Sequence, residues 1–155
     1  MHTFHSIRRL FLFLLLSLAA GLPVAAQKGL HIAPYLSMDY SKKHEATYTS
    51  VKGEQLREWH LTLFKSISLS HAPQEAARIA RDAQADGATA DQSEEVKKGD
   101  RLMACYYQLP PPEEKKNAPN RFVLFRRTEA GAATLIYIEG YTDLDKLIKL
   151  FIHKK

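Results

Sequence analysis

The apolar run at the N-terminus decides how much of this chain is available to fold. It extends from Leu10 to Leu22, follows Arg8 and Arg9, and ends at Pro23. A helix needs about 20 apolar residues to cross the hydrocarbon core of a membrane, so this run is too short to span it. Basic residues, a short apolar run and small residues are the successive parts of a secretory signal peptide. We therefore expect residues 1–26 to be removed before the protein reaches its final form.

Small residues mark the expected cleavage site. Val24 and Ala26 stand at the positions where a signal peptide usually carries small side chains, so we predict cleavage after Ala26 and Gln27 as the new N-terminus. Lipidation would require a cysteine just after that site, and the single cysteine is Cys105. The predicted product is an exported protein, periplasmic or secreted. It is not a lipoprotein, and it keeps no stable membrane span after processing.

Composition favours one small domain over residues 27–155. A chain of this size can bury a sizeable core without disulfides, and a single cysteine excludes an internal one. Processing removes two arginines and no acid, which lowers the formal net charge by two from +5. The remaining basic residues occur as scattered pairs rather than as one basic face, so we expect no nucleic-acid partner.

Hydrophobic periodicity predicts an α+β fold with an antiparallel sheet of about five strands. The last two strands are apolar on both faces, which predicts a central place in the sheet, and residues 129–131 predict a tight hairpin between them. Residues 88–100 are polar and predict a connector. The element order is β-β-α-β-β-β-α, and we expect both helices on one face of the sheet. The predicted strands are Glu45–Lys52, Leu61–Ser70, Leu102–Leu109, Arg121–Thr128 and Thr134–Glu139, and the helices are Pro73–Asp86 and the segment that follows Thr142.

Three details of these elements follow from their residue patterns. In the strand Leu61–Ser70, apolar and polar side chains alternate. Lys65 falls at a position that should be apolar and Phe64 at one that should be polar, which predicts a β-bulge at these two residues. Thr142 is the expected cap of the last helix. The expected buried faces are Ala76, Ile79, Ala80 and Ala83 in the first helix, and Leu144, Leu147, Ile148 and Phe151 in the last.

No motif in the chain predicts a catalytic, cofactor-binding or metal-binding site. The histidines after the signal peptide have neither the mutual spacing nor the cysteine partners of a metal site. Cys105 stands inside an apolar strand, where a thiol is expected to be inert. The acids between Asp82 and Asp100 lack the spacing of a calcium loop. We therefore expect no catalytic residue, no cofactor and no metal ligand.

Two features keep functional alternatives open. Glu139 ends an apolar strand just before Gly140, so a hydrolase with a dispersed site could use this carboxylate with a histidine that folding brings near. Exposed tyrosines together with Trp59 could stack on sugars or on a partner protein. The leading hypothesis is a non-enzymatic module of the cell envelope that binds a protein or a glycan. A structural subunit of an envelope assembly is the third alternative.

Two segments carry a resemblance to a known group of proteins. The strand Leu61–Leu69, and the strand Leu135–Gly140 leading into the helix of Leu144 and Leu147, resemble a family of small exported bacterial proteins of unknown function. The resemblance covers most of the chain after the signal peptide. It implies an envelope or secreted α+β domain without an established activity, and it transfers no functional residue.

The cleavage site can be tested by intact mass. Protein secreted by the native host is expected to have the mass of residues 27–155, because the small residues before Gln27 fit the peptidase. Mass spectrometry of the purified protein, with the mass of the unprocessed chain as reference, measures this directly. Retention of residues 1–26 would contradict the prediction.

Overall fold

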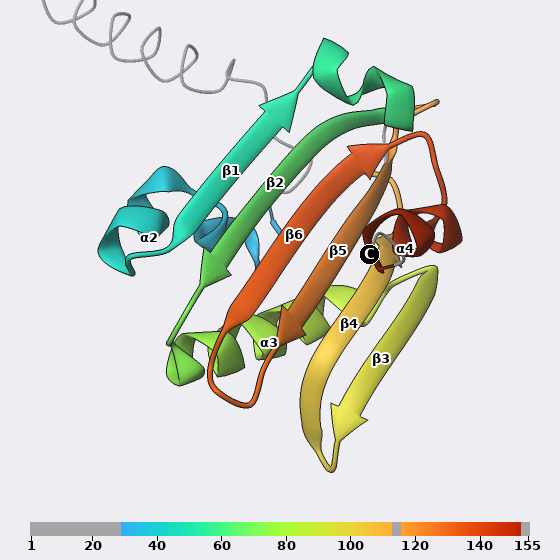
Figure 1. Cartoon of the computed structure of the whole chain (residues 1–155). Coiled ribbons are helices and arrows are strands. Elements are labelled where there is room, and N and C mark those ends of the chain that lie inside the picture. The colour runs from blue at the N-terminus through green and yellow to red at the C-terminus, as the bar shows by residue number, and fades with distance from the viewer. Residues whose placement is uncertain (1–28, 113–115, 153–155) are drawn as a thin grey trace, which may run out of the picture.

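The computed structural model describes residues 29–112 and 116–152, with Ile152 described by its backbone alone. The predicted signal peptide and its cleavage residues Val24, Ala26 and Gln27 lie outside the described residues. At the centre stands an antiparallel sheet in the order β1-β2-β6-β5-β4-β3 (Figure 1). The expected α+β class with an antiparallel sheet is confirmed.

The described residues form strands, α-helices and 3-10 helices with the following bounds. The strands are β1 (Thr47–Lys52), β2 (Leu61–Leu69), β3 (Gln92–Lys98), β4 (Arg101–Leu109), β5 (Asn120–Arg127) and β6 (Ala133–Gly140). The α-helices are α2 (Met38–Lys43), α3 (Pro73–Gly87) and α4 (Leu144–Ile152). Two 3-10 helices, η1 (Ala33–Tyr35) and η2 (Glu54–Trp59), precede α2 and β2.

The strand that the sequence pattern missed is β3, so the described residues form a sheet of six strands where about five were expected. It lies in the segment that was expected to be a polar connector. Every residue of β3 is exposed, and it pairs only with β4 at the edge of the sheet. A strand that buries neither face shows no apolar alternation, which is the signal that the prediction depends on. Its charged side chains also protect a sheet edge from pairing with other chains.

The two long helices lie on opposite faces of the sheet, so the expectation of helices on one face is wrong. Strands β5 and β6 are central, as predicted, and both of their faces are apolar. Leu135 and Tyr137 of β6 pack in the cluster that contains the buried residues of α3. Ile138, one position further along, packs with Leu144 and Leu147 of α4. Central strands with two apolar faces need a cover on each side, and Figure 1 shows α3 behind the sheet and α4 in front.

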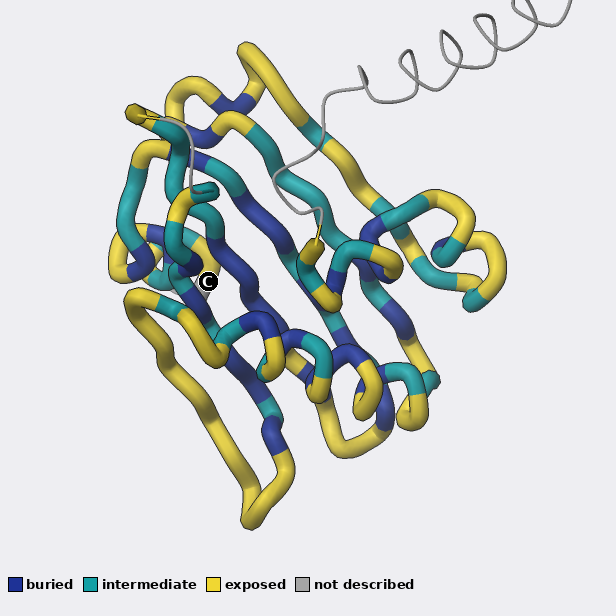
Figure 2. The backbone as a smooth tube through the Cα atoms, turned by 180° about the vertical axis from the view of Figure 1, so that it is seen from behind, coloured by how far each residue is buried: buried dark blue, intermediate teal, exposed yellow. Residues whose placement is uncertain are grey.

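The side of α3 carries the larger core cluster. The four residues expected to form the inner face of α3 are all buried, which confirms that prediction. Small side chains let the helix lie close to β4, where the ring of Tyr107 reaches the backbone of Gly87. Residues 29–43, here called the N-terminal arm, cover a further part of this side (Figure 2). Ile32, Tyr35 and Leu36 of the arm are buried in the same cluster.

Three carboxylates of α3 hold the N-terminal arm in place. They recur along one side of the helix at spacings of seven and four residues, which bring side chains round to the same face. The Tyr35 hydroxyl donates to Asp82 (2.5 Å), the Tyr40 hydroxyl donates to Glu75 (2.6 Å), and the amides of His31 and Ile32 donate to Asp86 (2.8 and 3.0 Å). Two of these acceptors, Asp82 and Asp86, are among the acids that were considered for a calcium loop, and they hold the arm instead.

The last helix differs from the prediction at both ends. Asp143, rather than Thr142, accepts the hydrogen bond of the first turn, from the amide of Lys146 (2.9 Å). Leu144, Leu147 and Ile148 pack on the sheet as expected. Phe151, which was expected to be buried with them, keeps 38% of its surface exposed. Within the described residues, no helix has both the length and the apolar character that a membrane crossing requires.

The contact between Gly87 and Tyr107 generates a stability prediction. A Cβ added at Gly87 would stand 2.4 Å from a ring atom of Tyr107, which is only 1% exposed. Gly87→Ala should therefore lower the free energy of unfolding by about 1–3 kcal/mol, although alanine is intrinsically the better helix former. Urea denaturation measures the change.

A matched control lies two residues earlier on the same helix. Ala85 is exposed, so Ala85→Gly should cost only the ordinary helix-propensity difference of about 1 kcal/mol. A Gly87→Ala variant as stable as the unmodified protein would show that the ring and the helix can separate without cost.

Candidate functional site

The connection between β1 and β2 places two apolar side chains over one face of the sheet. It consists of η2, in which residues three apart lie one above the other, so Leu56 and Trp59 share a side. The helix ends at His60, whose φ of 58° is in the left-handed region and turns the chain into β2. The backbone oxygen of His60 accepts from the amide of Tyr141 (2.8 Å), which ties this turn to the end of β6. Leu56 is buried, whereas Trp59 keeps 39% of its surface exposed.

A β-bulge at the start of β2 adds two more side chains to the same face. Leu61 pairs with Gly140 and Leu63 pairs with Glu139, so Thr62 is the extra residue. This bulge brings Leu61 and Phe64 to the side of α4, although their spacing would put them on opposite faces of a regular strand. The bulge was expected at Phe64 and Lys65, so its predicted place is wrong. Lys65 remains half-buried on the other face.

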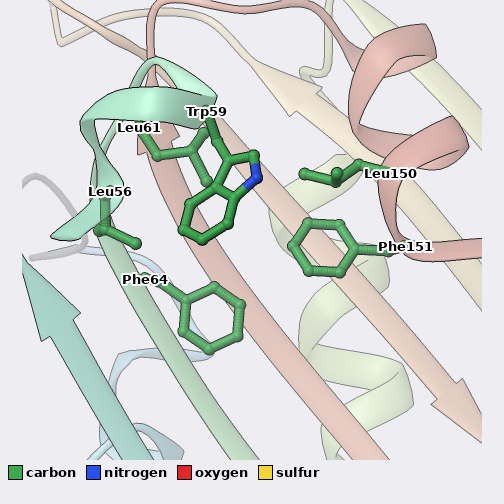
Figure 3. Close-up of a pocket in the computed structure, with 6 residues that line it drawn as sticks. All are labelled: Leu56, Trp59, Leu61, Phe64, Leu150 and Phe151. Carbon is green, nitrogen blue, oxygen red and sulfur yellow. The ribbon is translucent and has the colours of Figure 1, made fainter. Parts of the chain in front are cut away.

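The end of α4 closes this region from the other side. Leu150 and Phe151 follow the residues that pack on the sheet, and they point toward Trp59 and Phe64 (Figure 3). The rings of Phe64 and Phe151 are stacked with centroids 6.1 Å apart. These elements enclose a hollow of about 270 Å³, which we call the aromatic hollow. Its lining consists of Leu56, Trp59, Leu61, Phe64, Leu150 and Phe151.

The aromatic hollow combines concave shape with exposed apolar surface. All six lining side chains are apolar or aromatic, and Trp59 and Phe151 retain more than a third of their surface in contact with solvent. Single exposed apolar residues are ordinary on a protein surface, but a convergent group of them is typical of a binding site. The lining can therefore supply apolar contact and ring stacking. Its side chains carry no group that transfers protons.

A second hollow shares the side chain of Phe151 with the first. It has a volume of about 230 Å³ and is lined by Tyr106, Leu124, Phe125, Arg126, Thr134, Ile136 and Phe151. This lining includes a guanidinium group and hydroxyl groups, in contrast to the aromatic hollow. The Thr134 hydroxyl is within 3.2 Å of the Ser68 hydroxyl. One face of the sheet thus carries an apolar hollow and a more polar one that meet at a single ring, and we call the pair the α4 groove.

A third, polar hollow lies around the turn at His60. It has a volume of about 340 Å³, and its lining includes Glu54, Arg57, His60 and Tyr141. Arg57 already forms an ion pair with Glu54. The hollow shares Leu61 with the aromatic hollow, so the β1–β2 connection has an apolar side and a polar side.

Glu139 lies on the face of the sheet opposite the α4 groove. Its carboxylate accepts a hydrogen bond from the Tyr137 hydroxyl (2.9 Å). In the pairing of β5 with β6, Arg121 is the residue opposite Glu139. Burial raises the pKa of Tyr137, and the charge of Glu139 raises it further. Burial lowers the pKa of Lys65, while Glu139 acts in the opposite direction. Glu139 therefore belongs to a network of opposite charges and a tyrosine.

The structure does not bring Glu139 together with a histidine among the described contacts. The ring nitrogen Nδ1 of His31 lies 2.8 Å from Asp86, and the ring of His44 packs on that of Tyr40 with centroids 4.2 Å apart. His60 lines the polar hollow. None of these contacts joins a described histidine to Glu139, and His153 lies outside the described residues. Across the described residues, no group of three or more potential ligands could hold a metal ion.

Sequence reasoning singled out Trp59 but missed the groove around it. The hollow needs the turn at His60, the bulge at Thr62 and the final turn of α4, and none of these produces a periodic signal. Phe151 was placed in the core because it continues the apolar stripe of α4. A spacing of seven residues places Phe151 on the same face of the helix as Leu144. The spacing does not show that this face lies over an open hollow at the end of α4.

Cys105 is fully buried on the side of α3, as its strand pattern predicts. Burial raises the pKa of its thiol to about 12. At about pH 8 only roughly one such thiol in ten thousand is ionised, and the thiolate is the reactive form. Ellman's reagent should therefore leave Cys105 unmodified in the folded protein and titrate it fully in about 6 M guanidinium chloride. Rapid reaction without denaturant, at the rate of free cysteine in the same buffer, would contradict the prediction.

Comparison with known proteins identifies a family. A family model described as "Family of unknown function (DUF6108)" matches residues 19–151. No curated protein and no solved structure matches the chain. The match covers the described fold from the N-terminal arm to Phe151 in the last turn of α4. This chain therefore belongs to the DUF6108 family, a family of unknown function.

Proposed function

We propose that the protein is an exported, non-catalytic binding module of the cell envelope that takes an apolar ligand in the α4 groove. The observation that carries the proposal is the aromatic hollow, where side chains from η2, β2 and α4 converge and leave Trp59 and Phe151 partly exposed. The N-terminal sequence, with its basic residues, short apolar run and small residues, supports export.

The size of the groove supports a small ligand. Its two hollows, of about 270 and 230 Å³, together fall in the range of roughly 300–1,000 Å³ that is usual for small-molecule sites. Burying the exposed parts of two aromatic rings against a ligand releases ordered water and favours binding by about 25 cal/mol per Å² of apolar surface. The groove therefore offers a driving force for an apolar chain or ring.

The chemistry of the lining favours an apolar ligand over a glycan. Trp59 could stack on the apolar face of a sugar ring, as its exposure suggested. A bound sugar also needs partners for its hydroxyl groups, because buried polar groups without hydrogen bonds are costly. The six side chains of the aromatic hollow include one donor, the indole N–H of Trp59, and no side-chain oxygen. An aliphatic or aromatic ligand meets no such cost.

The single tryptophan makes the proposal testable. Trp59 is the only tryptophan in the chain, so its fluorescence reports on the aromatic hollow alone. The neutral probe N-phenyl-1-naphthylamine is expected to bind saturably, with a rise in probe emission and a matching loss of Trp59 emission through energy transfer. Phe151→Ala should weaken this binding about tenfold, because it removes the ring that both hollows share.

Met38→Ala provides the matched control. Met38 is also an exposed apolar side chain, 53% exposed, but it belongs to α2, far along the chain from the groove. This variant should bind the probe as the unmodified protein does. Equal loss in both variants, or a probe signal that does not saturate, would count against a site at the α4 groove.

A further inference from the structure

We infer that the ligand of the α4 groove is a fatty carboxylate, with its chain in the aromatic hollow and its carboxylate at Arg126. The inference rests on the proposed function and adds the chemical class and the orientation of the ligand. It follows from the difference between the two hollows. Among the described residues, those that line one hollow are all apolar or aromatic, and those that line the other include one cation.

The two hollows adjoin at Phe151, which contributes to the lining of both. Trp59 and Phe64 border the hollow on the side of η2 and β2, and Arg126 and Thr134 border the hollow over β5 and β6. A ligand that fills both must have a narrow apolar part and a polar end. A single unbranched chain satisfies the first requirement, because it presents the smallest cross-section where the ligand has to pass the ring of Phe151.

The charge of Arg126 selects the polar end. Its side chain is exposed on β5, and the described residues give it no ion-pair partner. Arg126 and Glu94 both lie within electrostatic range of the Tyr106 hydroxyl. Glu94 is the residue opposite Tyr106 on β3, and it is not part of the lining. The described residues of the lining therefore carry one positive charge and no negative charge.

A carboxylate is the head group that this arrangement fits best. A guanidinium group offers two parallel N–H donors, which match the two oxygens of a carboxylate. The hydroxyl groups of Tyr106 and Thr134 lie in the same lining and add donors at the same end. A neutral alcohol of equal chain length would fill the aromatic hollow equally well but would gain nothing from the charge of Arg126.

Decanoate and decanol test the inference, because they share one chain and differ in the head group. Trp59 fluorescence is measured while each is added to the purified protein below its micelle concentration or solubility limit. Decanoate is expected to bind about fivefold more tightly than decanol at low salt. Arg126→Gln should abolish that difference, because it weakens decanoate binding more than decanol binding, and Arg126→Lys should retain most of the difference. Raising the salt concentration should also reduce the preference.

Arg81→Gln is the control for a general change in net charge. Arg81 is an exposed arginine on α3, the helix on the opposite face, so its loss should leave both affinities unchanged. Equal binding of decanoate and decanol, with no effect of Arg126→Gln, would overturn the inference and leave the proposed function standing. If neither compound changes Trp59 fluorescence and the neutral naphthylamine probe fails as well, the proposed function falls too.

Discussion

The structure depends on two central strands that are apolar on both faces. Strands β5 and β6 cannot leave either face in water, so each side of the sheet has to be covered by another part of the chain. The chain covers the two faces of the sheet to different extents. On one side α3 and the N-terminal arm cover a broad cluster, and on the other side α4 and η2 leave part of the face open. The α4 groove is the uncovered remainder of the second side.

Hydrophobic periodicity predicted those parts of the fold in which buried side chains repeat regularly along a helix or a strand. The four small residues of α3, the central place of β5 and β6 and the burial of Cys105 all follow from side chains that repeat with the period of their element. β3 was missed because an exposed edge strand has no buried face. The placement of the two helices was wrong because the pattern of a strand shows that both faces are apolar but does not show which helix covers which face.

The candidate site was less predictable than the fold because it is made of irregularities. A left-handed residue at His60, an extra residue at Thr62 and the end of α4 together define the aromatic hollow. Each of these depends on how distant segments meet, since β2 and β6 set the register of the bulge and α4 supplies the opposite wall. Trp59 could be noticed as a single residue, but its neighbours could be identified only from the folded chain.

The attachment of the N-terminal arm gives the domain a part that can open by itself. The arm is joined to α3 through side-chain carboxylates, and its residues take no part in the pairing of the sheet. It can therefore separate without breaking any hydrogen bond between strands, although this uncovers Ile32, Tyr35 and Leu36. Opening of this kind is a local event with a lower free energy than global unfolding. The core on the side of α3 thus has a cover that can separate from it, whereas the opening on the other face is present in the folded structure itself.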